Sequence, residues 1–149
     1  MLSDAQIIFR LILSVFLSGL IGLERQMHKR TAGLRTHILV SMGSCLIMLT
    51  SFYVFDIYKD KASIDPARIA AGVITGIGFL GAGAIIRDRA EVKGLTTAAS
   101  LWVVAGIGLA VGCGFSKAAI YSTVLTLIIL FLLRRLESII FFEDKDTRR

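Results

Sequence analysis

Five stretches of the chain are apolar over nearly the length that a membrane-crossing helix needs. A hydrocarbon core about 30 Å thick takes about 20 helical residues to cross. The stretches cover residues 7–23, 37–55, 69–86, 95–113 and 118–133, and most charged residues lie in the gaps between them. The pattern predicts an all-α fold, a polytopic membrane bundle of five transmembrane helices formed by residues 1–136. A short charged cytoplasmic tail follows over residues 137–149, either as a continuation of the last helix or as an amphipathic surface helix.

The composition agrees with a membrane protein. Of 149 residues, 55% are hydrophobic and one is Pro, which is too apolar for a soluble domain of this length. The formal net charge of +6 would suggest nucleic-acid binding in a soluble protein. Here the Lys and Arg residues cluster between the apolar stretches, which is typical of membrane topology. We therefore expect the lipid bilayer as a partner and no nucleic acid.

Basic residues are concentrated on one side of the predicted membrane. The gaps after the first and third stretches and the tail hold twelve of them: Arg25, Lys29, Arg30, Arg35, Arg87, Arg89, Lys93, Arg134, Arg135, Lys145, Arg148 and Arg149. The opposite side holds Lys59, Lys61, Arg68 and Lys117, and Arg10 lies early in the first stretch. Because cytoplasmic loops carry the excess of Lys and Arg, we predict that the N-terminus lies outside and the C-terminus in the cytoplasm.

The third stretch is rich in glycine on two sides of a helix. At about 100° per residue, Gly72, Gly76 and Gly83 share one side, and Gly78 and Gly81 lie nearly opposite. Small residues let membrane helices approach closely, since lipid offers no hydrophobic reward for helix association. We therefore expect these five glycines to pack against other helices, and the third helix to lie in the middle of the bundle.

The fourth stretch repeats the four-residue spacing of glycines at Gly108 and Gly112, which we also expect to pack. Trp102 in the same stretch is either a packing wedge or a residue of the interfacial aromatic belt. The alternative for residues 78–83 is an unwound segment whose carbonyls face an ion, as in transporters with broken helices. With no Pro and no acidic residue nearby, close packing is favoured.

Polar residues gather at the predicted cytoplasmic ends of the helices. Glu24 and Arg25 close the first stretch, and two interpretations are open. In the first interpretation they form a solvated charge pair. In the second, Glu24 turns inward and pairs with a cation such as Arg35 or Arg87, because ionisable residues at membrane depth usually face protein or a wet cavity.

Two similar segments precede the second and fourth helices. Residues 33–37 read Gly-Leu-Arg-Thr-His and residues 94–97 read Gly-Leu-Thr-Thr. Free backbone N–H groups at a helix start receive an anion or carboxylate, although ordinary N-capping by Thr explains the same residues. The candidate functional rim is therefore Glu24, Arg25, Arg35, Thr36, His37, Arg87, Asp88, Thr96 and Thr97.

The sequence gives no sign of enzyme chemistry. It has no Walker loop, catalytic triad or paired carboxylates, so we expect no catalytic residues, no cofactor and no metal site. Asp88 and Glu91 are at most half of an oxygen site for magnesium. Cys45 and Cys113 lack zinc or redox spacing and are interpreted as packing residues.

Four ordered motifs, GLIGLERQ, AGLRTHILVSMGS, GIGFLGAGAIIRD and VKGLTTAASLWVVAGIG, closely resemble the membrane domain of the MgtC/SapB family. The likeness extends from about Leu17 to Leu133. The resemblance implies a bacterial inner-membrane protein linked to growth in low magnesium, to acid stress and, in some pathogens, to survival in macrophages. Family members were labelled magnesium transporters, whereas MgtC itself is implied to be a regulator that restrains the F-type ATP synthase.

One departure affects what the resemblance implies. MgtC proper continues into a soluble cytoplasmic domain, whereas this chain stops at Arg149 and resembles the shorter SapB-like branch. We expect a non-enzymatic regulator that acts through helix–helix contacts, as a homo-oligomer or with membrane proteins such as the F-type ATP synthase. The alternatives are a small oligomeric transporter or channel for magnesium or another ion, and a purely structural scaffold.

Overall fold

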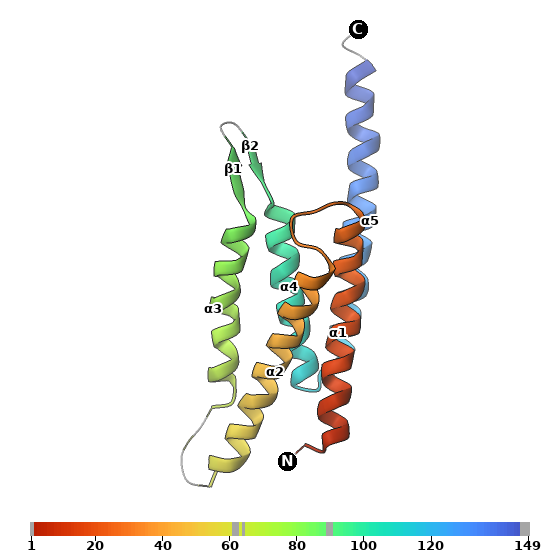
Figure 1. Cartoon of the computed structure of the whole chain (residues 1–149). Helices are drawn as coiled ribbons and strands as arrows, with labels where there is room; N and C mark the ends of the chain where they lie inside the picture. The colour runs from red at the N-terminus through yellow and green to blue at the C-terminus, as the bar shows by residue number, and fades with distance from the viewer. Residues whose placement is uncertain (1, 61–62, 64, 89–90, 147–149) are drawn as a thin grey trace.

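The computed structural model describes residues 2–60, 63, 65–88 and 91–146, with their side chains except at 88 and 137–146. Within these residues five helices run alternately up and down (Figure 1): α1 (Asp4–Met27), α2 (Leu34–Tyr58), α3 (Ala67–Ala84), α4 (Leu95–Gly112) and α5 (Ser116–Asp146). Each contains a stretch long and apolar enough to cross a membrane. The predicted five-helix bundle is therefore confirmed, and the chain is a multi-pass membrane protein.

The connections divide the molecule into two ends. The α1–α2 loop, the link between α3 and α4 and the C-terminal half of α5 lie at one end, which we call the basic end (Figure 1). The N-terminus and the α2–α3 and α4–α5 connections lie at the other end. α5 is unbroken from Ser116 to Asp146, so the tail continues the last helix as far as it is described. Lys61, Arg89, Arg148, Arg149 and the side chain of Lys145 lie outside the described residues.

The link between α3 and α4 differs from the prediction. Instead of continuing to Ile86, α3 ends at Ala84, and β1 (Ile86–Asp88) pairs antiparallel with β2 (Glu91–Lys93), Ile86 opposite Lys93. Gly94 joins β2 to α4 with a φ of 91°, and a Cβ there would overlap the carbonyl oxygen of Ala84. Only glycine adopts this left-handed conformation without strain, so Gly94 fixes the end of the hairpin against α3.

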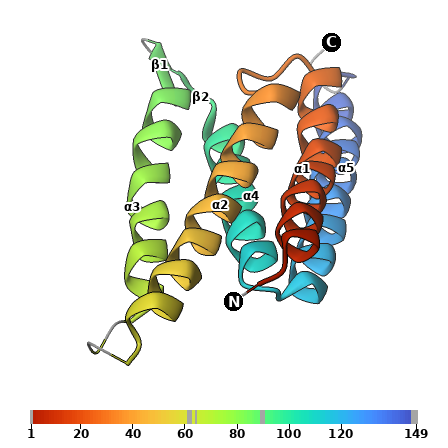
Figure 2. The same cartoon turned by 60° about the horizontal axis from the view of Figure 1, so that its bottom comes forward.

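Helix α4 occupies the centre of the bundle. It packs against α1, α2, α3 and α5, and it lies behind α2 and between α3 and α1 in Figure 2. The side chains of Val104, Ala105 and Val111 are completely buried. Leu17 and Cys45 bring α1 and α2 into the same core cluster as Val104 and Val111. Half of the residues of α4 are buried, a larger share than in the apolar window of any other described helix.

Close contact between α4 and α2 is made at two glycines. A Cβ at Gly108 would overlap the carbonyl oxygen of Ser41, and one at Gly112 would lie 2.7 Å from the Cβ of Met48. The packing predicted for these two glycines is therefore present. Trp102 is 55% exposed on α4, so it is not a packing wedge within this chain, and its place in the interfacial aromatic belt stays a prediction.

Helix α3 lies at the edge of the bundle (Figures 1 and 2), so its predicted central position is wrong. It packs against α2 and α4. Gly81 faces α4, where an added Cβ would lie 3.7 Å from the Cβ of Ala98. A Cβ at Gly72, Gly76, Gly78 or Gly83 would meet no atom of the described residues within 4 Å. Helical periodicity predicts which glycines of α3 share a face, but it does not show whether another helix of the same chain packs on that face.

The stretch from Gly78 to Gly83 is part of the continuous helix α3, which contradicts the alternative of an unwound segment.

Arg10 lies at the end of the bundle opposite to the basic end. Its guanidinium donates a hydrogen bond of 2.7 Å from Nη1 to the carbonyl of Gly112. A cation at this position also complements the negative end of the α4 dipole. Arg10 thus ties the beginning of α1 to the end of the central helix.

Gly108→Ala is expected to destabilise the bundle, because the new methyl group would meet the rigid backbone of α2. Overpacking of this kind costs about 1–3 kcal/mol. Gly106→Ala is the matched control, since a Cβ at Gly106 meets nothing within 4 Å. Thermal unfolding in detergent should show a lower Tm for Gly108→Ala alone. Equal Tm values for the two variants would contradict the close α2–α4 contact.

Candidate functional site

The last turn of α1 places a carboxylate inside the basic end. Arg25 Nε donates to Glu24 Oε2, His28 Nδ1 lies 2.9 Å from Glu24 Oε1, and Arg134 Nη1 of α5 lies 3.8 Å from the same oxygen. The side chains of Arg25 and Glu24 are only 3% and 12% exposed. Glu24 thus turns into the bundle and joins α1 to α5. The sequence predicted Arg35 or Arg87 as the cation paired with Glu24, and this prediction is wrong.

The way in which α1 ends brings another cation to this position. Lys29 has a φ of 52°, and the N–H of Lys29 donates to the carbonyl of Gln26 over 3.0 Å. The N–H of Arg30 donates to the carbonyl of Arg25 over 3.1 Å. This pair of bonds is the Schellman end of a helix, in which a left-handed residue follows the last turn. The chain therefore reverses and Arg30 returns to the level of Arg25.

His37 joins three helices below the same end. Its side chain is buried, its Nδ1 donates to the carbonyl of Gly33 over 2.9 Å, and its Nε2 lies 2.9 Å from Ser100 Oγ of α4. A Cβ at Gly22 of α1 would come within 2.9 Å of the Cβ of His37. Only a glycine at position 22 lets α1 approach this histidine so closely. His37 therefore has a packing and hydrogen-bonding position in the structure.

The two glycine-led helix starts are built differently from simple threonine caps. Neither Gly33 nor Gly94 provides a side-chain cap, so N-capping by Thr is wrong. At α2 the free N–H of Leu34 donates to Gln26 Oε1 over 3.1 Å. At α4 Thr97 is buried, and its Oγ1 lies 3.4 Å from Thr31 Oγ1. The threonines thus serve contacts between segments, and Thr96 remains exposed in the first turn of α4.

A cavity of about 140 Å³ opens between α1, α4 and α5 at this end. Its walls combine guanidinium groups, a hydroxyl and an apolar face of α5: Arg25, Arg30, Thr96, Ile129, Leu130, Leu133 and Arg134. We call it the arginine pocket. Only Arg25 and Thr96 of its residues belong to the rim predicted from the sequence. Arg30 and Arg134 were missed because the loop geometry of α1 and the packing of α5 bring them there.

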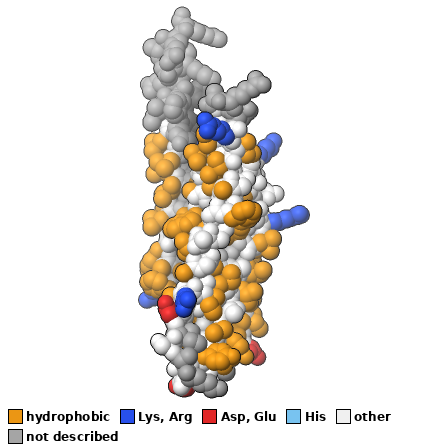
Figure 3. Space-filling view, turned by 90° about the vertical axis from the view of Figure 1, so that its left-hand side faces the viewer, with side chains coloured by type: hydrophobic (Ala, Val, Ile, Leu, Met, Phe, Trp, Pro, Cys, Tyr) orange, Lys and Arg blue, Asp and Glu red, His pale blue; other side chains and the backbone are white. Residues whose placement is uncertain are grey.

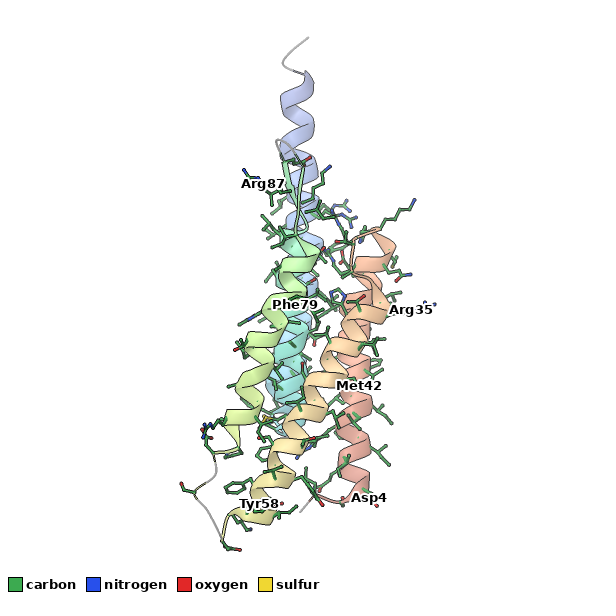
Figure 4. The ribbon with its side chains drawn as sticks, turned by 60° about the vertical axis from the view of Figure 1, so that its left-hand side comes forward. Asp4, Arg35, Met42, Tyr58, Phe79 and Arg87 are labelled. Atoms are coloured by element: carbon green, nitrogen blue, oxygen red, sulfur yellow. The ribbon has the colours of Figure 1, made fainter. Side chains whose placement is uncertain are left out.

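The other rim residues lie elsewhere. Arg35 and Arg87 are exposed and point away from each other, one from the start of α2 and the other from β1 (Figure 4). Thr36 is exposed near the start of α2. The backbone of Asp88 pairs with Glu91, and the side chain of Asp88 lies outside the described residues. Within the described part of the chain, no three His, Cys, Asp or Glu side chains gather as a metal site would require.

Glu24→Gln is expected to destabilise the protein, because it leaves the buried guanidinium of Arg25 without its counter-charge. Breaking a buried ion pair from one side costs about 3–5 kcal/mol, whereas replacing both partners costs less. The double variant Glu24→Gln, Arg25→Met is the control, and both are measured by reversible unfolding in micelles. A double variant less stable than Glu24→Gln alone would contradict this pairing.

Comparison with known proteins finds related sequences. The sequence profile of the MgtC family matches residues 11–139. The chain is 50% identical over 128 residues to the "Putative magnesium transporter YhiD" of Escherichia coli K12, and the match covers 85% of this chain and 60% of that relative. It is 44% identical over 127 residues to "Protein MgtC" of Salmonella typhimurium 14028s, covering 85% and 52% of the two chains.

An uncharacterized protein of Haemophilus influenzae is 39% identical over 130 residues, which are 84% of this chain and 55% of that relative. The chain thus spans between about half and three fifths of the length of these curated relatives. No solved structure matches it significantly. The profile match over residues 11–139 and the identities to YhiD and MgtC show that the chain belongs to the MgtC family.

Proposed function

We propose that this protein is a non-enzymatic regulator in the bacterial inner membrane that acts by binding a transmembrane helix of another membrane protein. The basic end faces the cytoplasm in this proposal, since Lys and Arg accumulate in cytoplasmic loops. The process it serves is adaptation to magnesium limitation or acid stress. The relatives YhiD, described as a putative magnesium transporter, and MgtC support a role in magnesium homeostasis.

The observation that carries the proposal is an apolar groove between α2 and α3. The α2 wall includes Leu39, Gly43 and Ile47, and the α3 wall includes Gly72 and Gly76. A second hollow, lined by Thr31, Thr36 and Gly83 among others, continues toward the basic end. The glycines predicted to share one face of α3 therefore line a groove along most of this helix.

The outer surface of the bundle at this place is suited to a helix. Figure 3 views the molecule from the side of α3 and shows hydrophobic side chains alternating with white areas of backbone and other side chains. Because a Cβ at Gly72 or Gly76 would meet nothing within 4 Å, the α3 backbone is accessible to a neighbour. A partner helix that reaches a glycine face gains close van der Waals contact, which is the main attraction between helices in lipid.

Gly76→Leu should abolish partner binding, since a leucine side chain would fill the groove between α2 and α3. Gly78→Leu is the matched control, because Gly78 is equally open but does not line the groove. The measurement is growth at low magnesium of a host lacking its own copy, complemented by each variant at equal membrane abundance. We expect growth to fail for Gly76→Leu and to be normal for Gly78→Leu.

The occupant of the groove is identified by chemical cross-linking in membranes followed by mass determination. An adduct whose mass is a multiple of the chain mass indicates a homo-oligomer, and an adduct of one chain with a protein of another mass indicates a different membrane protein. Full complementation by Gly76→Leu would contradict the proposal, because the groove would then have no part in the function.

The second candidate is a magnesium transporter, which the description of YhiD favours. Transport by this chain would need a polar path across the membrane. Several buried hydroxyls instead bond back to the backbone of their own helix, as Ser18 does to Ser14 and Thr123 does to Ala119. Purified protein in liposomes with a magnesium-sensitive dye separates the candidates. We expect no protein-dependent flux. Flux that Glu24 or Arg35 substitutions abolish would overturn the regulator proposal.

A further inference from the structure

The arginine pocket contains more positive than negative charge. Three guanidinium groups, those of Arg25, Arg30 and Arg134, line it. Among the side chains that the structure describes, Glu24 is the carboxylate paired with this group, through Arg25 and Arg134. Among these described side chains, one carboxylate balances one of three cations. Arg30 and part of the Arg134 side chain are exposed, so the excess positive charge attracts an anion that reaches the pocket from outside the bundle.

Hydrogen-bonding capacity is also unused at this position. Arg134 Nη1 is buried and, within the described part of the chain, has no hydrogen-bond partner. Its nearest ion-pair contact, Glu24 Oε1, lies 3.8 Å away, which is beyond hydrogen-bond distance. A buried donor left unpaired costs free energy, so the pocket favours an acceptor that Arg134 can reach. The exposed hydroxyl of Thr96 in the first turn of α4 adds another donor to the same cavity.

The remaining wall of the pocket is apolar and belongs to α5. Ile129, Leu130 and Leu133 precede Arg134 by one to five positions, so they continue from the guanidinium toward the middle of the membrane. Ile129 and Leu133 are about half exposed on the outside of the bundle. A ligand with an anionic group next to a hydrocarbon chain matches both parts of this surface.

We propose that the arginine pocket binds the phosphate group of an anionic phospholipid from the leaflet at the basic end. The phosphate oxygens accept hydrogen bonds from Arg30 and Arg134, which guanidinium geometry suits well. The acyl chain lies along the apolar face of α5. The bound lipid then joins α1, α4 and α5, and its site lies on the opposite side of α4 from the α2–α3 groove.

The test compares lipid retention by native mass spectrometry and lipid-induced stabilisation. Wild-type protein in mild detergent is offered equal amounts of phosphatidylglycerol and phosphatidylcholine. We expect preferential retention of phosphatidylglycerol and a higher Tm in its presence. Arg30→Gln and Arg134→Gln should each lower phosphatidylglycerol binding about tenfold, the effect of one lost hydrogen bond to a charged group.

Arg35→Gln is the matched control, because it removes one cation from the same end without touching the pocket. It should retain phosphatidylglycerol as the wild type does. The Tm of each variant in phosphatidylcholine shows whether it is folded, and Arg30→Gln, at an exposed position, should leave this value unchanged. Equal losses in Arg30→Gln and Arg35→Gln would contradict a specific pocket and indicate a general charge effect.

Inorganic phosphate separates a lipid from a soluble ligand. Titrated into the protein in phosphatidylcholine, it should raise the Tm far less than phosphatidylglycerol does, because it makes no contact with α5. If phosphate alone stabilises the wild type as strongly, and Arg30→Gln removes this effect, the ligand is a soluble phosphate and the lipid proposal is wrong. Equal retention of both phospholipids by the wild type would also overturn it.

Discussion

The close contact between the backbones of α2 and α4 is the constraint on which the rest of the bundle depends. At Gly108 and Gly112 there is no room for a side chain, so α4 is pressed against Ser41 and Met48 of α2. This contact places α4 in the centre, where it also reaches α1, α3 and α5. Helices in lipid associate through such backbone proximity, since burial of apolar surface brings no gain there.

The positions of the two candidate sites follow from the central position of α4. Helix α3 packs on one side of the bundle through Gly81, and Gly72 and Gly76 are left on the outside, along the groove with α2. On the other side, the first turn of α4 meets the end of α1 and the face of α5 at the arginine pocket. The close-packed centre thus leaves a groove for a helix and a pocket for an anion on different faces.

The sequence predicted the number of helices, their limits within a few residues except at the end of α5, and the accumulation of cations at one end. These features depend on local hydropathy and charge, which each segment carries by itself. The glycine spacing at Gly72 and Gly76 is the same as at Gly108 and Gly112, yet among the residues that the structure describes only the second pair has a neighbour within 4 Å of an added Cβ. The spacing of glycines is a property of one helix, whereas the helix that packs on those glycines depends on the arrangement of all five helices.

The candidate site was predicted less completely for the same reason. Glu24 and Arg25 were recognised by their position at the end of an apolar stretch, but the partner Arg134 comes from a helix about 110 positions later. Arg30 reaches the pocket through the left-handed turn at Lys29. Lysine rarely adopts this conformation, so the sequence does not predict the turn.

The central functional claim is that the α2–α3 groove receives a transmembrane helix. It is tested most directly by placing a photoreactive amino acid at Leu39 or Leu80, which line the groove, and at Ala71, which does not. In living cells, irradiation should give a protein adduct of one defined mass from Leu39 and Leu80 and none from Ala71. Adducts with lipid alone at all three positions would contradict the claim.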